Sequence, residues 1–177
     1  MGTVPAWRGQ SPSVRAARPA DSRAIGALAS RAWRAAYADV LAPDVLDSMN
    51  PLEQAADWHA YLSDLPPADR LWVIGPPDDV WGFARTGPCT DADAPPGAGE
   101  VHGLYLEPAR IGTGLGRALF AHAVADLETR HGVVCVWHFA ANEQAGRFYE
   151  RAGFALDGAG RPSSFGVVEV RRSRARP

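Results

Sequence analysis

Hydrophobic positions recur along the chain with a helical period in some stretches and a strand period in others. Apolar side chains fall on one face of residues 22–37, with Asp21 as the expected N-cap of this helix. A second helix is expected from about Leu52 to Leu62. After a glycine-rich turn, helical spacing returns in a long helix from Leu115 that ends near His131. The pattern thus predicts three helices between residue 22 and about residue 131.

Short apolar and aromatic runs predict strands in the middle of the chain. The runs Leu71–Ile74 and Val80–Arg85 are separated by a segment of Gly, Pro and Asp, which predicts a hairpin. A loop rich in Gly, Pro and Asp over residues 87–99 then leads into another strand candidate, Glu100–Leu106.

The last part of the chain alternates the two kinds of element again. Val133–Phe139 is almost continuously apolar, as expected of a strand buried on both faces. A helix is expected from about Asn142 to Ala152, and a closing pair of strands around residues 154–156 and 166–170. Strands interleaved with helices predict a mixed α/β sheet.

The expected organisation is one domain over residues 14–172. Residues 1–13 mix Gly, Pro, Ser and Gln without periodicity and are expected to form a flexible lead-in. Residues 173–177 are expected to be a basic tail. The basic cluster at this end is interpreted as solvated, and it comprises Arg171, Arg172, Arg174 and Arg176.

Composition narrows the class of protein. A net charge of −2 and a pI near 6.2 give no general reason to bind nucleic acid or an anionic membrane. No run approaches the roughly 18 apolar residues of a membrane span. The two cysteines, Cys89 and Cys135, form no C-x-x-C pair, so a reducing, cytoplasmic location is expected.

All 18 basic residues are arginine. Because lysine is absent, a Schiff-base lysine, a P-loop lysine on a nucleotide phosphate and a Ser-Lys nucleophile are excluded.

The segment Ile111–Gly116, Ile-Gly-Thr-Gly-Leu-Gly, lies between a strand and a helix. Unpaired backbone N–H groups and the positive end of the helix favour an anion here, and glycine lets the backbone approach phosphate oxygens closely. A Walker A loop is excluded by the missing lysine. A Rossmann fingerprint needs more sheet than the remaining chain can supply. A phosphate cradle after a central strand is the interpretation that remains, beside that of a simple helix-entry turn.

Residues 106–119, which contain this turn, resemble the acetyl-CoA-binding motif of the GNAT superfamily of N-acetyltransferases. Residues 142–154, Asn-Glu-Gln-Ala-Gly-Arg-Phe-Tyr-Glu-Arg-Ala-Gly-Phe, resemble its second signature. The resemblance implies an acyltransferase with a central twisted sheet of about six to seven strands, splayed in the middle and flanked by about four helices. It implies acetyl-CoA as co-substrate and no metal. Ile111 departs from the family pattern, which has Arg or Gln there, and Arg110 stands one position early.

The resemblance also implies cofactor contacts. The strand Leu104, Tyr105 and Leu106 would hold the pantetheine arm. The backbone of Gly112, Thr113, Gly114, Leu115, Gly116 and Arg117 would surround the pyrophosphate. Asn142 would cap its helix, lie near the cofactor, or do both.

For catalysis, Tyr149 matches the family tyrosine that protonates the departing thiolate, which a phenol of pKa about 10 can do at neutral pH. Its alternative role is that of a core aromatic. Glu100 is the first candidate for the general base, because protein-acetylating members carry a glutamate at this spacing. His102, two residues on, should share its face, and His138 lies on the neighbouring strand; either could be base or relay. The histidine spacing supports no zinc site.

The acceptor amine is expected on the side of the first two helices. Its pocket is predicted to include Trp33, Tyr37, Trp58, His102 and His138, although each aromatic could equally be core. The expected partner is a small amine, with a protein or peptide N-acetyltransferase and a non-catalytic CoA-binding sensor as alternatives. A homodimer is also considered.

Overall fold

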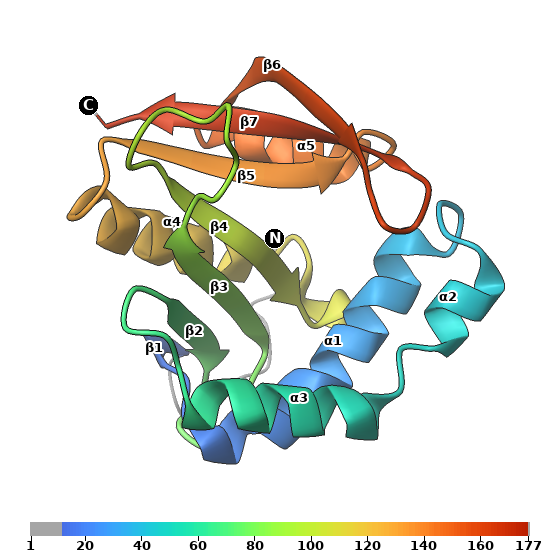
Figure 1. Ribbon diagram of the computed structural model, residues 1–177. Coiled ribbons are helices and arrows are strands. Elements are labelled where there is room, and N and C mark those ends of the chain that lie inside the picture. Colours follow the sequence, from blue (N-terminus) through green and yellow to red (C-terminus); the bar gives the residue numbers. More distant parts are fainter. Residues whose placement is uncertain (1–11, 177) are drawn as a thin grey trace, which may run out of the picture.

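The computed structural model describes residues 12–176, which form one mixed sheet with helices on both faces (Figure 1). The strands lie in the order β1-β2-β3-β4-β5-β7-β6. They are β1 (Ser13–Ala16), β2 (Arg70–Gly75), β3 (Gly82–Pro88), β4 (Gly99–Leu106), β5 (Val133–Phe139), β6 (Ala155–Pro162) and β7 (Val168–Ala175). The helices are α1 (Ser22–Tyr37), α2 (Pro43–Asp47), α3 (Pro51–Ser63), α4 (Leu115–Glu128) and α5 (Glu143–Arg151), and single 3₁₀ turns cover Pro19–Asp21 and Pro108–Arg110.

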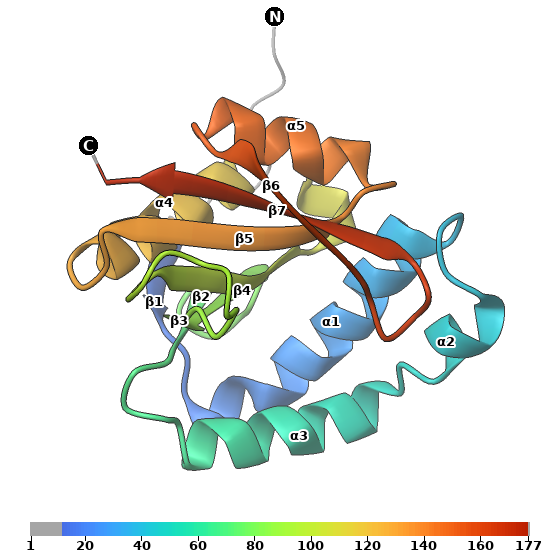
Figure 2. The same cartoon turned by 45° about the horizontal axis from the view of Figure 1, so that its top comes forward.

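The sheet separates two helical layers, with α1 and α3 on one face and α4 and α5 on the other (Figure 2). Side chains that alternate along a strand therefore enter different cores. In β2, Leu71 and Val73 pack with α1 and α3, whereas Ile74 packs with α4. In β5, Val134 and Val136 enter the core shared with α4 and α5. This two-sided burial explains why β5 is almost continuously apolar.

The two central strands run parallel but separate along their length. β4 and β5 pair at Gly99↔Val134, Glu100↔Cys135 and Val101↔Val136. Beyond Val101 the edge of β4 that faces β5 has no strand partner among residues 12–176, although β3 continues to pair with its other edge as far as Leu106. The predicted splay of the central strands is therefore confirmed, and it opens a fork between the two faces of the sheet.

A β-bulge in β4 lies at the start of this fork. Arg85 of β3 pairs with Gly103, but the next residue, Thr86, pairs with Val101, so His102 is the extra residue. An extra residue shifts the alternation of side chains. Val101 faces α4 before the bulge and Leu104 faces it afterwards.

The sequence predicts the sheet class, the hairpin and the long helices correctly, but it misses β1 and the short helix α2. The interpretation of the basic cluster as a solvated tail is wrong, because residues 173–175 belong to β7 and pair along β5. Arg171 is only 3% exposed, since aspartates surround its guanidinium. Ser13, assigned to the lead-in, pairs with Gly75 in β1. Residues 1–11 of that lead-in lie outside the described residues.

Within the described residues, no helix is long and apolar enough to cross a membrane.

Candidate active site

A cavity of about 1490 Å³ surrounds the fork between β4 and β5 and reaches both faces of the sheet. Its walls come from α1, the glycine-rich loop, the start of α4, the inner face of α5, and the ends of β5 and β7. On one side lies the helix N-terminus that the sequence predicts as a phosphate cradle. On the other side lie aromatic and acidic side chains. The fork therefore connects two chemically different compartments.

The glycine-rich loop is shaped by two residues in the left-handed region of backbone conformation. Gly112 has φ 82° and Gly114 has φ 89°, and other residues adopt such values only with strain. Gly114 is also the N-cap of α4. Thr113 stabilises the turn, because its hydroxyl donates a 2.6 Å hydrogen bond to the carbonyl oxygen of Arg110.

This loop fits a diphosphate. A Cβ built on either Gly112 or Gly114 would meet no atom within 4 Å, so the space above the backbone is open. The first amides of α4, from Leu115 to Arg117, have no intrahelical acceptor and point out of the helix end. Leu106, at the end of β4, packs close to Gly116, where a Cβ would lie 2.7 Å from the leucine side chain. The end of β4 and the cradle are thus held together.

Arg110 does not replace the arginine or glutamine that Ile111 displaces. Its guanidinium carbon lies 3.4 Å from the ring centroid of Trp81, so the charge is stacked on an indole, and Arg110 is not among the residues that line the cavity. Ile111 is 51% exposed at the edge of the cavity. Neither Arg110 nor Ile111 therefore adds a charged side chain to the predicted anion site.

Tyr149 lies on the buried side of α5, with its ring centroid 5.3 Å from that of Phe120, in the core between α4, α5 and the sheet. It is 6% exposed, and it borders the cavity. Burial raises the pKa of the Tyr149 phenol, and the nearby phenols of Tyr37 and Tyr105 raise it further. The hydroxyl is consequently protonated at neutral pH, as a proton donor must be. Its packing shows that the two predicted roles, core aromatic and cavity-lining acid, are compatible.

Asn142 caps α5, because its side-chain oxygen accepts a 3.0 Å hydrogen bond from the amide of Ala145. It also borders the cavity near Tyr37. The cap interpretation is confirmed, and a cofactor contact stays a prediction.

Glu100 and His102 do share one surface, as their spacing suggests. His102 Nδ1 lies 3.1 Å from Glu100 Oε1, and both residues line the cavity. Glu100 is 8% exposed and lies at the last paired positions of β4 and β5, where the fork begins. A carboxylate placed there can reach the acceptor side of the opening.

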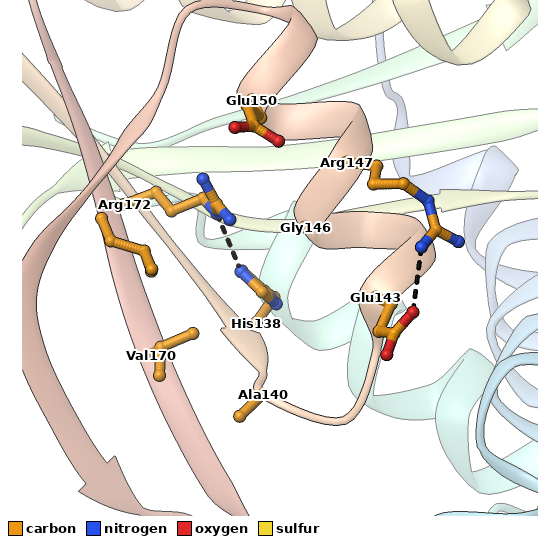
Figure 3. Close-up of a pocket in the computed structure, with 9 residues that line it drawn as sticks. His138, Ala140, Glu143, Gly146, Arg147, Glu150, Val170 and Arg172 are labelled. Atoms are coloured by element: carbon orange, nitrogen blue, oxygen red, sulfur yellow. Dashed lines mark hydrogen bonds and ion pairs between the residues drawn. The ribbon is translucent and has the colours of Figure 1, made fainter.

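His138 faces α5, and not α1 (Figure 3). Arg172 Nε donates a 3.2 Å hydrogen bond to His138 Nε2. Since arginine only donates, Nε2 carries the lone pair and Nδ1–H donates to the carbonyl oxygen of Phe139, at 2.9 Å. Burial lowers the pKa of His138, although its backbone hydrogen bond partly opposes this. Both ring nitrogens are already bonded, so the predicted role of His138 in acceptor binding or proton transfer is not supported by this geometry.

On the α1 face of the sheet, aromatic rings from distant parts of the chain line the cavity. Trp33 contacts Tyr37 at 5.1 Å between ring centroids and Phe165 at 5.3 Å. Phe139 lies 4.8 Å from Tyr37. These rings join α1 to the loop between β6 and β7, which the ribbon shows side by side (Figures 1 and 2). We call these four residues the aromatic wall.

Trp58 lies outside this cavity, which corrects its predicted place in the acceptor pocket. Its ring packs 5.3 Å from Phe83 and 5.8 Å from Tyr61, in the core between α3 and the sheet. Because α3 lies outside α1 relative to the fork, a side chain on its buried side fills core and does not reach the fork.

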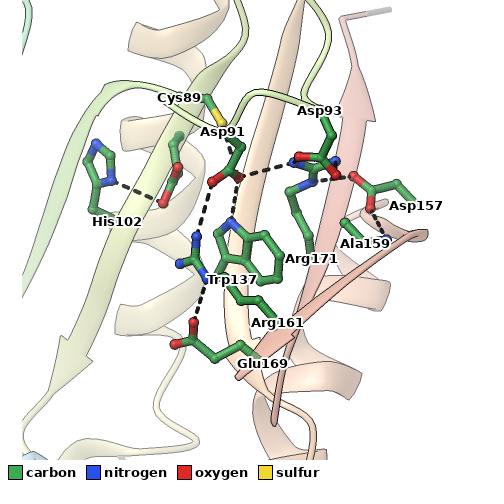
Figure 4. Close-up of polar contacts among 11 residues, drawn as sticks. Cys89, Asp91, Asp93, His102, Trp137, Asp157, Ala159, Arg161, Glu169 and Arg171 are labelled. Atoms are coloured by element: carbon green, nitrogen blue, oxygen red, sulfur yellow. Dashed lines mark hydrogen bonds and ion pairs between the residues drawn. The ribbon is translucent and has the colours of Figure 1, made fainter. Parts of the chain in front are cut away.

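Figure 4 shows a network of charged side chains that includes Glu169, which pairs with Phe139 of the aromatic wall across β7 and β5. Arg161 donates from Nε to Glu169, at 2.8 Å, and from Nη1 to Asp91, at 3.0 Å. Its guanidinium lies 4.0 Å from the ring of Trp137. Arg171 also bonds Asp91, at 3.1 Å. Burial raises the pKa of Asp91, but hydrogen bonds from Trp137 and Arg171 outweigh burial and hold it below the usual range.

Sequence reasoning missed Trp137, Arg161, Phe165 and Glu169, all of which line the cavity. Alternation along β5 could have indicated Trp137 and Phe139, since they flank His138 and must face the other side. Arg161 and Glu169 become neighbours only through the register of β6 and β7.

Residues 28–154 match the model of the acetyltransferase (GNAT) family. A probable N-acetyltransferase of Mycobacterium tuberculosis is 27% identical over 151 residues, covering 82% of this chain and 80% of that protein. Among solved structures, the PaiA N-acetyltransferase of Thermoplasma acidophilum in complex with coenzyme A superposes with a TM-score of 0.70 at 15% identity, over 93% of this chain and 99% of that one. The ribosomal-protein-S18-alanine N-acetyltransferase of Escherichia coli gives 0.65 at 18% identity, over 93% and 94%.

An open sheet with a forked centre and a main-chain diphosphate cradle defines an acyl-CoA-binding fold. The chain belongs to the GNAT family of acetyltransferases, and it is an acetyl-CoA-dependent acyltransferase.

Proposed function

We propose that this enzyme moves the acetyl group of acetyl-CoA directly to a primary amine of a small molecule, in a ternary complex. The observation that carries the proposal is the fork through the sheet. It opens between a diphosphate cradle on the α4 face and a carboxylate with an aromatic wall on the α1 face. Two substrates that enter from opposite faces can meet there without a covalent enzyme intermediate.

Acetyl-CoA, when bound, supplies the activated acetyl group. The amides from Gly112 to Arg117 would hold its diphosphate, and the free edge of β4 from Leu104 to Leu106 would hold its pantetheine arm. This arrangement would bring the reacting end of the donor to the fork.

The chain would contribute one acid and one base. The buried Tyr149 hydroxyl, with its raised pKa, would donate its proton to the departing sulfur. The Glu100 carboxylate would take the proton of the attacking amine, directly or through water, with His102 beside it. His138 would serve only to support Tyr149, since its ring packs 5.8 Å from the phenol and is itself held by Arg172.

A small acceptor is favoured because the aromatic wall spans the acceptor side. Contact between Trp33 and Phe165 links α1 to the β6–β7 loop across this side of the cavity. The structural likeness to an S18-alanine N-acetyltransferase keeps a protein N-terminus as the second candidate. A protein substrate would need this contact to open.

The experiment is a thiol-release assay with acetyl-CoA against amines and peptides. We expect Tyr149→Phe to lower kcat by about 10²-fold or more with little change in acetyl-CoA affinity. Glu100→Gln should lower kcat/KM and remove the acidic limb of the pH-rate profile. Unchanged turnover would exclude either residue from its role. Acetyl-CoA binding without turnover on any amine would instead favour a sensor.

A further inference from the structure

We propose that the acceptor carries a second cationic group, and that Glu169 and the aromatic wall hold this group while the amine reacts at the fork. The inference rests on the proposed function and names its substrate class, a diamine or longer polyamine.

Strand pairing determines which side chains lie on the face of the sheet where the acceptor is proposed to bind. Glu100 pairs with Cys135 and Glu169 pairs with Phe139, so alternation puts both carboxylates on the face of β5 that carries Trp137 and Phe139. This is the α1 face, opposite Tyr149. Glu100 lies at the paired end of the fork, and Glu169 lies farther along, beside the aromatic wall. One extended molecule on this face could therefore contact both carboxylates.

Acidic side chains outnumber basic side chains in the charge network on this face. The network of Figure 4 sets Asp91, Asp93, Asp157 and Glu169 against Arg161 and Arg171. Arg161 divides its single charge between Glu169 and Asp91. Glu100 adds another carboxylate, with an oxygen within 4.8 Å of an Asp91 oxygen. Of these carboxylates, Glu100 and Glu169 line the cavity, and an ammonium ion entering it could pair with them.

The aromatic wall gives the second, independent argument. Trp33, Tyr37, Phe139 and Phe165 line one wall of the cavity, and Glu169 lines it with them. The carboxylate of Glu169 is near enough to raise the pKa of the Tyr37 phenol, after the larger effects of burial and of Asn142. Aromatic rings and a carboxylate together are the surroundings that favour an organic cation over a neutral or anionic group.

Trp137 does not belong to this cation site. Its ring is covered by Arg161, at 4.0 Å, and its indole nitrogen donates to Asp91, at 2.8 Å. Those contacts orient Arg161, so that Glu169 is bonded by Nε alone and keeps Oε1 for a ligand.

The test compares three acceptors of equal chain length: putrescine, n-butylamine and γ-aminobutyrate. We expect kcat/KM to be about tenfold higher for putrescine than for n-butylamine, and lowest for γ-aminobutyrate. The preference should arise mainly in KM and should weaken at high ionic strength.

Glu169→Gln should bring the ratio of kcat/KM for putrescine to kcat/KM for n-butylamine near one, because it removes the charge that would distinguish the two amines. Glu169→Asp, which keeps the charge, should retain most of the preference. Glu53→Gln removes the same charge from the first turn of α3, outside the cavity, and should change nothing. A ratio near one in the wild type, or a ratio unaffected by Glu169→Gln, would overturn the inference.

Calorimetry with the CoA-bound protein separates this inference from the proposed function. Tighter binding of putrescine than of n-butylamine, lost in Glu169→Gln, supports the cation site even if no thiol is released. In that case the proposed function fails and the inference stands. Equal binding of the two amines overturns the inference alone when turnover is observed.

Discussion

Replacing Arg171 with methionine should destabilise the fold strongly, because this residue is buried and forms ion pairs with three aspartates, and is not part of a solvated tail. Its guanidinium donates to Asp157 at 2.8 Å, to Asp93 at 2.9 Å and to Asp91 at 3.1 Å. Removing one partner of a buried ionic network typically costs about 3–5 kcal/mol, since the remaining charges lose their compensation.

The expected loss of unfolding free energy depends on how well each aspartate is compensated once Arg171 is removed. Asp93 is 66% exposed on its side chain and can be hydrated once Arg171 is gone. Asp91 keeps Arg161 and Trp137 as partners. Asp157, only 19% exposed on its side chain, keeps just the amide of Ala159. One carboxylate is therefore poorly compensated, and we expect a loss of about 3 kcal/mol, or roughly 6–12 °C in Tm for a domain of this size.

Urea unfolding followed by far-UV circular dichroism measures this difference, with Arg147→Met as the matched control. Arg147 pairs with Glu143 on the surface of α5, where both side chains are more than half exposed, so its loss should cost at most about 0.5 kcal/mol. If Arg171→Met and Arg147→Met unfold at the same urea concentration, the network contributes nothing to stability and this reasoning is refuted.

Three further outcomes are expected. Gly114→Ala should weaken CoA binding about tenfold by calorimetry, because φ 89° strains any other residue by about 1–2 kcal/mol, whereas Gly132→Ala, which has open space and no positive φ, should bind normally. The profile of kcat against pH should show no falling limb below about pH 10, because burial raises the pKa of Tyr149; a fall centred near pH 8 would contradict its role as the acid. His138 has a lowered pKa in the folded state, so the unfolded chain binds the proton more readily; stability should fall as pH drops below about 6.5, and His138→Gln should flatten that dependence in urea titrations.

Patterns in the sequence predict those features of the structure that depend on interactions between residues close together in the chain. Two glycines in a strand-to-helix turn predict a cradle, and Gly112 and Gly114 indeed have positive φ. Helical spacing predicts α1, α4 and α5. The cap formed by Asn142 is equally local, since donor and acceptor are three residues apart.

The features that the sequence does not predict depend on register between distant segments. His102 reaches Glu100 although a bulge interrupts the alternation, and a bulge has no reliable sequence signal. The arginines near the end of the sequence resemble a charged tail. Arg171 is nevertheless buried, because it bonds Asp91, which lies 80 residues earlier in the chain. The family resemblance predicts Trp58 in the pocket, because it puts the acceptor on the side of the first two helices, but the packing of α3 directs this ring against Phe83 in the core.

The proposed acceptor side would couple stability to specificity in this enzyme. A face that binds a cation must keep carboxylates ionised in a partly buried place, which is unfavourable unless other charges compensate for part of the cost. Arg161 and Arg171 do so from β6 and β7, and the compensation stays incomplete because the carboxylates outnumber them. Adding a further arginine to this face should therefore stabilise the fold while weakening the binding of a cationic acceptor, since both would neutralise the same excess charge.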